Sequence, residues 1–313
     1  MEDQVYADSA KCPYVVGNIV KLKLKPVHSQ QQEVTAKITK IFEPFTFSCA
    51  MVVNLIHSTS LLALNNHQVV LKIFDRRFAT QFRRDEHASL HTTTDIERQY
   101  HQFVRDGGAA NFIANYDASD DEEEYEWDDP HNEAYLQYGM QHFYEAEIEA
   151  YNILKDVQGQ DIPCLFASFT LPSLFSPGNQ LCDIPGVILQ HIDGFPLGDI
   201  SLHAPKEKWQ SVCDDAISIV HMMGDRGILN KDVKTRSFIV REESEGSFNV
   251  FMIDFAMCNF RQQYDDETEW RKDKAIQDEE GAVGYVMEDS LKGGYTYHRS
   301  LLYTKLDREF KAE

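Results

Sequence analysis

Two aspartates follow short apolar segments and could take part in phosphate chemistry. Asp232 lies in "GILNKDVKTRSFIV" and Asp254 lies in "VFMIDFA". A carboxylate at the end of an apolar strand offers the hard oxygen ligands that Mg²⁺ prefers, and a second carboxylate can accept the proton of an attacking hydroxyl. We therefore predict that Asp254 is a metal ligand and Asp232 a catalytic base, with Lys234 close enough to meet a phosphate group.

A lysine and a glutamate elsewhere in the chain could complete such a site. Lys72 lies in the strand-like "VVLKIF", and Glu147 lies in the helical "EIEAYNIL". A glutamate that fixes a flexible ammonium lets the lysine hold phosphates. Simpler interpretations stay open: Lys72 as an edge-strand lysine that reaches solvent, Glu147 as one of a solvated acidic set with Glu145 and Glu149, and the two aspartates as turn or capping residues.

The elements around these residues predict an α+β protein. Alternating and β-branched patterns predict an N-terminal antiparallel sheet of about five strands. The predicted strands are Ile19–Leu24, Val34–Phe42, Phe47–Ile56, Leu61–Leu64 and Gln68–Phe74, with two later strands at Cys164–Leu171 and Pro185–Ile192. Helical spacing predicts helices over His142–Val157 and Trp209–Met223, and residues 75–106 are polar and compatible with helix.

Composition limits the classes of partner. The 313 residues, 42% of them apolar, can bury a large core, and the formal charge of −21 argues against a nucleic-acid partner, which needs clustered Lys and Arg. The N-terminus has no secretory signal pattern, and the apolar runs are too short to cross a bilayer. We expect a soluble cytoplasmic or nuclear protein without a membrane partner, whose six dispersed cysteines are free thiols.

An acidic tract interrupts the chain. Residues 117–130 read "DASDDEEEYEWDDP" and include no basic residue. Like charges repel one another, so the tract is predicted to be an extended, solvated insertion. The alternative is a docking segment for a basic protein partner, or for the two arginine pairs Arg76-Arg77 and Arg83-Arg84.

In this order, the motifs resemble the eukaryotic protein-kinase-like fold, and specifically the divergent protein-kinase-like families found in fungi. Lys72 and Glu147 match the lysine and glutamate of those proteins, "GVILQHIDGFPL" their interlobe hinge, Asn230-Lys231-Asp232 their His-Arg-Asp, "IDFA" their Asp-Phe-Gly, and "QDEEGAVGYVM" a buried helix. The resemblance implies a two-lobed fold. Its N-terminal lobe, with an antiparallel sheet and one main helix, would span residues 1–190, including an insertion at about 80–140, and a mainly helical lobe would span 191–313.

The same resemblance implies ATP and Mg²⁺ as cofactors. Lys72 and Glu147 would hold the nucleotide phosphates, and Leu189, Gln190, His191 and Ile192 would line the adenine position, with Leu189 as gatekeeper. Asp254 and Ser237 would hold metal, and Asp232 and Lys234 would act on the acceptor, either a protein hydroxyl or a small molecule.

Three departures from the pattern point toward weak activity. No glycine occurs between Val34 and Lys72, where backbone should approach phosphates closely. Ser237 replaces a metal-binding asparagine, and the segment from Asp254 to Asp278 is as short as in RIO-type and aminoglycoside or choline kinases. We therefore expect an ATP- and Mg²⁺-binding phosphotransferase of weak activity. The alternatives are a pseudokinase that serves as a binding scaffold and an unrelated α+β fold in which the aspartates coincide by chance.

Overall fold

The structure, a computed structural model, describes residues 11–25, 32–56, 67–118, 127–173, 178–244 and 246–310. The chain forms two compact units: unit 1 comprises residues 1–144 and 165–191, and unit 2 comprises 145–164 and 192–313. Residues 145–164, which the sequence analysis grouped with the N-terminal half, thus belong to unit 2. In the ranges given above, no helix is long and apolar enough to cross a membrane.

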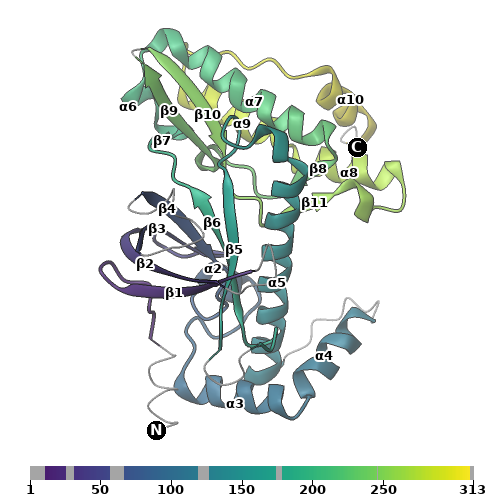
Figure 1. Ribbon diagram of the computed structural model, residues 1–313. Coiled ribbons are helices and arrows are strands. Elements are labelled where there is room, and N and C mark those ends of the chain that lie inside the picture. The colour runs from purple at the N-terminus through teal and green to yellow at the C-terminus, as the bar shows by residue number, and fades with distance from the viewer. Residues whose placement is uncertain are drawn as a thin grey trace. The chain divides into compact units, whose positions relative to one another are not determined.

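Unit 1 is built on a closed barrel of six antiparallel strands (Figure 1). Neighbouring strands around the barrel follow the order β1-β2-β3-β4-β6-β5. Their bounds are β1 Ile19–Leu24, β2 Gln32–Ile41, β3 Cys49–Ile56, β4 Gln68–Ile73, β5 Leu165–Leu171 and β6 Ile184–Gln190.

The closed barrel corrects the predicted fold. Pairing of β1 with β5, through Lys23 with Thr170 and Leu24 with Phe169, closes the sheet on itself. A kinase-like lobe has an open sheet, so the prediction of a two-lobed kinase-like fold with about five N-terminal strands is wrong, although the protein is α+β. The prediction missed the closure because the paired residues lie far apart in the sequence, with Phe169 about 145 residues after its partner Leu24. The predicted strand Leu61–Leu64 lies outside the described residues.

Apolar side chains fill the barrel. Leu22, Ala36, Met51 and Leu71 are among its buried core residues, because alternate residues of each strand point to the same face. Gly186 in β6 lies under the ring of Phe169, where an added Cβ would come within 2.4 Å of the ring. A side chain at this position would therefore force the aromatic ring out of the core.

Four helices of unit 1 follow β4. Gly107, in the left-handed conformation with φ 77°, separates α3 from α4. Helices α2 and α3 lie in the segment 75–106, which was predicted to be polar and compatible with helix. Tyr100, Val104, Ala109 and Ala134 pack together, which places α3 and α4 beside the first turns of α5 (Figure 1). The predicted helix at 142–157 is the end of the longer α5, followed by a short 3-10 turn. The bounds are α2 Thr80–Asp85, α3 Thr94–Arg105, α4 Gly108–Asp117 and α5 Asp129–Ile153, of which the part up to Tyr144 belongs to unit 1.

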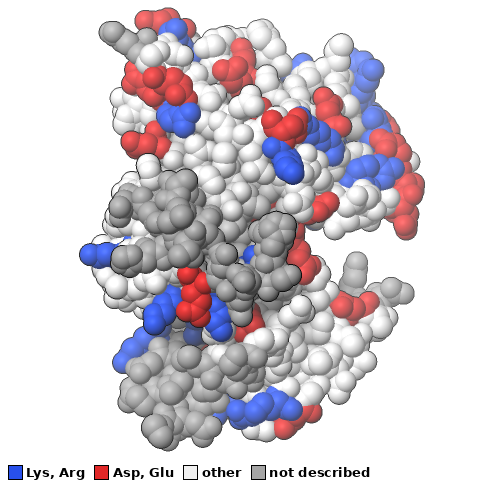
Figure 2. All heavy atoms as spheres, in the orientation of Figure 1, with Lys and Arg blue, Asp and Glu red and all other residues white. Residues whose placement is uncertain are grey.

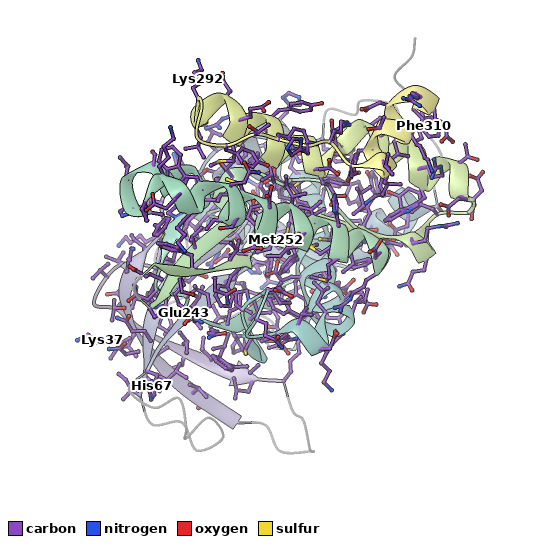
Figure 3. All side chains as sticks on the ribbon, turned by 90° about the horizontal axis from the view of Figure 1, so that it is seen from above. Lys37, His67, Glu243, Met252, Lys292 and Phe310 are labelled. Carbon is purple, nitrogen blue, oxygen red and sulfur yellow. The ribbon has the colours of Figure 1, made fainter. Side chains whose placement is uncertain are left out.

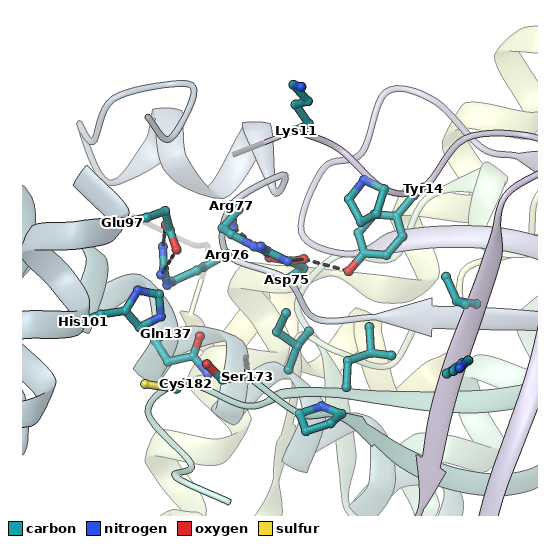
Figure 4. Close-up of a pocket in the computed structure, with 16 residues that line it drawn as sticks. Lys11, Tyr14, Asp75, Arg76, Arg77, Glu97, His101, Gln137, Ser173 and Cys182 are labelled. Atoms are coloured by element: carbon teal, nitrogen blue, oxygen red, sulfur yellow. Dashed lines mark hydrogen bonds and ion pairs between the residues drawn. The ribbon is translucent and has the colours of Figure 1, made fainter. Parts of the chain in front are cut away.

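The arginine pairs do not serve as receptors for the acidic tract in the described residues. Arg76 and Arg83 are buried and bind the buried carboxylates of two glutamates. Arg76 binds both Glu97, at 2.8 Å from its Nη1 (Figure 4), and Glu133. Arg83 binds Glu133 at 2.5 Å. We call these four residues the ionic network. Residues 119–126 of the tract lie outside the described residues.

Unit 2 consists of helices packed around two small sheets. Helix α7 packs against α9, β10 and β8, and α10 packs against α8. Met252 at the end of β10 is fully buried among the side chains in Figure 3, whereas Lys292 points outward. The sheets have the orders β10-β9-β7 and β11-β8. The bounds are β7 Phe195–Pro196, α6 Ile200–His203, α7 Trp209–Asp225, β8 Ile228–Asn230, β9 Phe238–Ser244, β10 Ser247–Met252, β11 Cys258–Phe260, α8 Glu267–Gln277, α9 Glu279–Ser290 and α10 Leu301–Phe310.

The cysteines are free, as predicted. Cys49, Cys182, Cys213 and Cys258 are buried, Cys164 is half-buried and Cys12 is exposed. Buried thiols of this kind behave as small apolar side chains.

Candidate functional site

The site of unit 2 is organised by Asn230, the last residue of β8. Its side-chain oxygen accepts the backbone N–H of Asp232 at 2.9 Å, and its Nδ2 donates to the backbone oxygen of Asp254 at 2.9 Å. The adjacent Lys231 N–H donates to the carbonyl of Met257 at 3.0 Å. One amide side chain therefore joins the backbones of the two predicted site aspartates.

Asp254 has an unusual backbone conformation. It follows β10 and adopts φ 72°, a left-handed conformation that non-glycine residues rarely take. The next N–H, that of Phe255, donates to Glu147 Oε2 at 2.9 Å, and Asn230 holds the Asp254 carbonyl. A residue in such a conformation costs about 1–3 kcal/mol and persists only where its surroundings impose it, most often at functional sites. The carboxylate of Asp254 is exposed.

Glu147 is the inward-facing member of its acidic set. Its side chain is fully buried, whereas Glu145 is exposed and Glu149 is half-buried. Because Glu147 accepts the Phe255 N–H, it is the acid that supports the Asp254 turn. Lys72, its predicted partner in holding phosphates, belongs to unit 1, whereas Glu147 belongs to unit 2.

The loop after β8 carries the other predicted residues. Lys234 donates from its ammonium to Asp232 Oδ1, and Arg236 lies 4.0 Å from Asp232 Oδ2. The hydroxyl of Ser237 accepts the Lys234 N–H at 3.3 Å and lies 3.5 Å from the carbonyl of Asp232. Ser237 is buried, so in this arrangement its hydroxyl supports the shape of the loop that presents Asp232 and Lys234.

A buried acid, Glu279, supports the loop after β8. Glu279, the first residue of α9, accepts the Asn230 backbone N–H at 2.8 Å and the ammonium of Lys274 at 3.1 Å. Burial raises the pKa of Glu279, although Lys274 and the Asn230 N–H act in the opposite direction. Neither Lys274 nor Glu279 was predicted as a site residue; Glu279 lies in the segment "QDEEGAVGYVM" that resembles a buried helix, and Lys274 precedes that segment.

Tyr151 lies beside the Asp254 turn. Its ring meets that of Phe255 edge to face, with centroids 5.4 Å apart. Burial, helped by the carboxylates of Glu147 and Asp254, raises the pKa of Tyr151 well above its usual value, so the hydroxyl stays protonated. That buried hydroxyl has no hydrogen-bond partner among the described residues.

The remaining predicted residues lie mostly in unit 1. Lys72 is 6% exposed, and its strand β4 pairs with both β3 and β6, so the interpretation of an edge-strand lysine that reaches solvent does not hold. Its ammonium lies 5.5 Å from the centre of the Phe74 ring. Leu189 is buried in β6, which ends at Gln190, and His191 follows. Ile192 is buried and belongs to unit 2.

The acidic side chains of unit 2 could bind a hard cation that also has phosphate or water ligands. In the described ranges, no group of three or more His, Cys, Asp or Glu side chains is arranged to hold a metal ion. Mg²⁺ commonly binds through one or two carboxylates together with phosphates and water. Asp254 is exposed and lies on a segment that Asn230 joins to that of the half-buried Asp232, so Asp254 is the carboxylate that could hold Mg²⁺ together with a phosphate ligand.

No family model matches this sequence, and no curated protein matches it at a significant level. The functional interpretation therefore depends on the geometry of these side chains.

Proposed function

We propose that unit 2 carries the phosphate-transfer site of an ATP- and Mg²⁺-dependent phosphotransferase. The observation that carries the proposal is the joint bracing of Asp232 and Asp254 by Asn230, with Asp254 in a left-handed turn fixed by Glu147. Phosphoryl transfer requires positioned charge more than covalent chemistry. Two carboxylates and an ammonium held on braced loops meet that requirement.

Each residue has a distinct part in this proposal. Asp254 would hold Mg²⁺, which neutralises charge on the phosphates when bound. Asp232 would accept the proton of the acceptor hydroxyl while that oxygen forms its bond to the terminal phosphorus and the bond to the ADP oxygen breaks. Lys234, whose ammonium already lies beside Asp232, balances charge on the transferred group.

Nucleotide binding gives the first test. A ligand that binds only the folded state raises the unfolding midpoint according to its occupancy, by a free energy of about 2.7 kcal/mol at one hundred times its Kd. We expect ATP with Mg²⁺ to stabilise the wild-type protein and not the Asp254→Asn variant. Asp265→Asn, which changes an exposed acid of the same unit, is the matched control and should respond like the wild type. Absence of any shift at millimolar nucleotide would refute the proposal.

Lys72 is tested separately because it belongs to unit 1. If its buried ammonium contributes to nucleotide binding, Lys72→Ala will lower the midpoint shift produced by ATP. An unchanged shift would remove Lys72 from the site without affecting the assignments in unit 2.

A scaffold without transfer activity is the second candidate. It is favoured by Ser237, whose hydroxyl is engaged within the loop. Release of phosphate from ATP, and its transfer to protein hydroxyls, should be measured for the wild type, for Ser237→Asn and for Asp232→Asn. Activity that Asp232→Asn abolishes supports the enzyme. Nucleotide binding with no transfer in either the wild type or Ser237→Asn supports the scaffold.

A further inference from the structure

The loop after β8 carries an arginine whose hydrogen-bond donors are nearly unused. The side chain of Arg236 is 66% exposed, and within the described ranges its one ion pair joins Nη2 to Asp232 Oδ2 at 4.0 Å. This separation is longer than a hydrogen bond. A guanidinium has five N–H donors in a planar fork. Arg236 can therefore bind an anion while it stays beside the proposed base.

Two other arginines of unit 2 are already engaged with carboxylates. Arg226 binds Asp156 through two nitrogens, at 2.9 and 2.8 Å, and Arg241 binds Glu243 through its Nε at 2.8 Å. On the face of unit 2 drawn in Figure 2, many Lys and Arg atoms likewise lie next to Asp and Glu atoms. Arg236 differs from these arginines because it has no direct hydrogen bond to a carboxylate of the described residues.

Lys231 adds a second cation to the same loop. It directly precedes Asp232, it is exposed, and its ammonium makes no hydrogen bond or ion pair with the part of the chain that the structure describes. Residues 231–237 thus carry three cations and one acid, in a chain of net charge −21. The 3-10 turn at 197–199 packs against the loop and adds one exposed acid, Asp199. A positive excess remains, and it attracts anions.

The contact between Arg236 and Asp232 determines where the anion lies relative to the acceptor hydroxyl. The contact is 4.0 Å long and an ionic hydrogen bond is about 2.8 Å, which places an anion on the same nitrogen within roughly 7 Å of Asp232 Oδ2. In an extended peptide, residues two positions apart point to the same side and are separated by about 6.6 Å. The distance therefore fits a carboxylate two residues from an acceptor serine or threonine.

The exposure of the loop favours a polypeptide as acceptor. The side chains of Lys234 and Arg236 are 48% and 66% exposed, and Lys231 is exposed. Small molecules are usually bound in concave sites that bury most of their surface. An extended protein segment instead makes contacts that are spread over several residues, and an open loop can supply these.

We propose that Arg236, assisted by Lys231, selects a protein acceptor in which an acidic residue lies about two positions from the phosphorylated serine or threonine. The inference rests on the proposed phosphotransferase function, which places the acceptor hydroxyl at Asp232. Arg236 would bind the acidic side chain through two parallel N–H···O bonds. The acceptor oxygen then bonds to the terminal phosphorus, the bond from that phosphorus to the ADP oxygen breaks, and the hydroxyl proton passes to Asp232.

Three peptides test this selectivity. Each has one central serine among alanines, and the residues two positions before and after the serine are Glu, Gln or Lys. We expect the wild type to bind the Glu peptide at least about fivefold more tightly than the Gln peptide, and the Lys peptide most weakly. Fluorescence anisotropy measures binding without nucleotide. If the Glu peptide binds no better than the Gln peptide, the inference is wrong.

Variants assign the preference to Arg236. Arg236→Glu should bind the Lys peptide more tightly than the Glu peptide, because the charge that selects the acceptor is reversed. Lys272→Glu is the matched control, since it makes the same change of charge at an exposed position of α8, and it should keep the wild-type preference. An Arg236→Glu variant that still prefers the Glu peptide would overturn the assignment.

Transfer of phosphate from radiolabelled ATP to the same peptides separates this inference from the proposed function. Equal rates of transfer to the Glu, Gln and Lys peptides would support the phosphotransferase and refute the selectivity. Tighter binding of the Glu peptide without any transfer would refute the phosphotransferase and leave Arg236 as a binding residue for acidic segments. Faster transfer to the Glu peptide, lost in Arg236→Glu and kept in Lys272→Glu, supports both.

Discussion

The ionic network of unit 1 and the two site aspartates of unit 2 differ in how accessible their charged groups are. In unit 1 the ionic network is closed: Arg76, Arg83, Glu97 and Glu133 are buried and bind one another. In unit 2 Asp254 is exposed and Asp232 half-buried, although their backbones are firmly braced. Buried charges need partners, whereas accessible carboxylates on a fixed backbone can reach a ligand. From this difference we expect the ionic network to determine stability and the two aspartates to determine activity.

The largest expected effect is on the ionic network. Glu133→Ala leaves two arginines without their shared carboxylate in a buried place, and we expect the free energy of unfolding to fall by about 3–5 kcal/mol. Glu145→Gln, which changes an exposed acid of the same helix α5, is the control and should change it by less than about 0.5 kcal/mol. Urea denaturation measures both. A loss of similar size in the two variants would remove the contrast between buried pairs and surface acids.

Asp254→Asn should lower activity and leave stability unchanged, which is the reverse of what we expect for Glu133→Ala. Asparagine accepts left-handed backbone angles well, so the unfolding free energy should stay within about 0.5 kcal/mol of the wild type. Phosphate transfer from ATP should fall by about 100-fold or more, because the charged oxygen ligand is lost. Rates and urea midpoints measured on the same samples check this. A variant that unfolds easily while it keeps its rate would assign Asp254 a structural function.

The pH dependence of stability should reveal His101. Burial lowers its pKa to about 4, against the effect of Glu97, so the folded state favours neutral imidazole. The resulting stability is present above the usual pKa of about 6.5 and is lost as the pH falls toward 4, by at most about 1.4 kcal/mol per pH unit.

Measurements between pH 6.5 and 5 on the wild type and matched histidine variants separate this contribution from that of other groups. They avoid the titration of Glu97, whose pKa is lowered to about 2 by Arg76 against the effect of burial and whose contribution is lost only as the pH falls below about 4.5. His101→Gln should flatten the decline of the unfolding free energy, and His142→Gln, which replaces an exposed histidine, should preserve it. If the unfolding free energy declines equally with falling pH in all three proteins, the pKa of His101 is not lowered by the fold.

The smallest effect concerns Tyr151. Its buried hydroxyl lacks a partner in the described part of the chain, so Tyr151→Phe should leave the unfolding free energy unchanged or raise it by about 1 kcal/mol. Tyr303→Phe is the contrasting variant, since the Tyr303 hydroxyl donates to Glu279 at 3.2 Å and its loss should destabilise. Thermal unfolding compares the two. Destabilisation by Tyr151→Phe would mean that the hydroxyl makes a favourable contact near Asp254.

Local patterns predicted the elements well. The predicted strand Ile19–Leu24 coincides with β1, and the predicted helix from Trp209 begins where α7 begins, because alternation and helical spacing are properties of neighbouring residues. Asp232 and Asp254, which were predicted to share one site, lie on segments that Asn230 joins, while their catalytic and metal-binding roles stay predictions.

Relations between distant residues were not predictable in the same way. Nothing near Arg83 in the sequence signals Glu133, 50 residues later. The sequence also does not show that acids of α3 and α5 bind the arginines, which the alternative interpretation paired with the acidic tract. Glu279 likewise supports Asn230 from 49 residues away. Such contacts depend on how elements pack, which periodicity alone does not encode.

The closure of the barrel has a mechanical consequence. In the described residues β1 pairs with β5 through two residue pairs, whereas β1 and β2 share six. The barrel therefore has one short seam, to which the bond from Lys25 N–H to the Ser168 carbonyl adds a further contact. Under a stretching force, or in spontaneous opening, the strands should part along this seam first, and the amide hydrogen of Lys25 should exchange with solvent before those between β2 and β3.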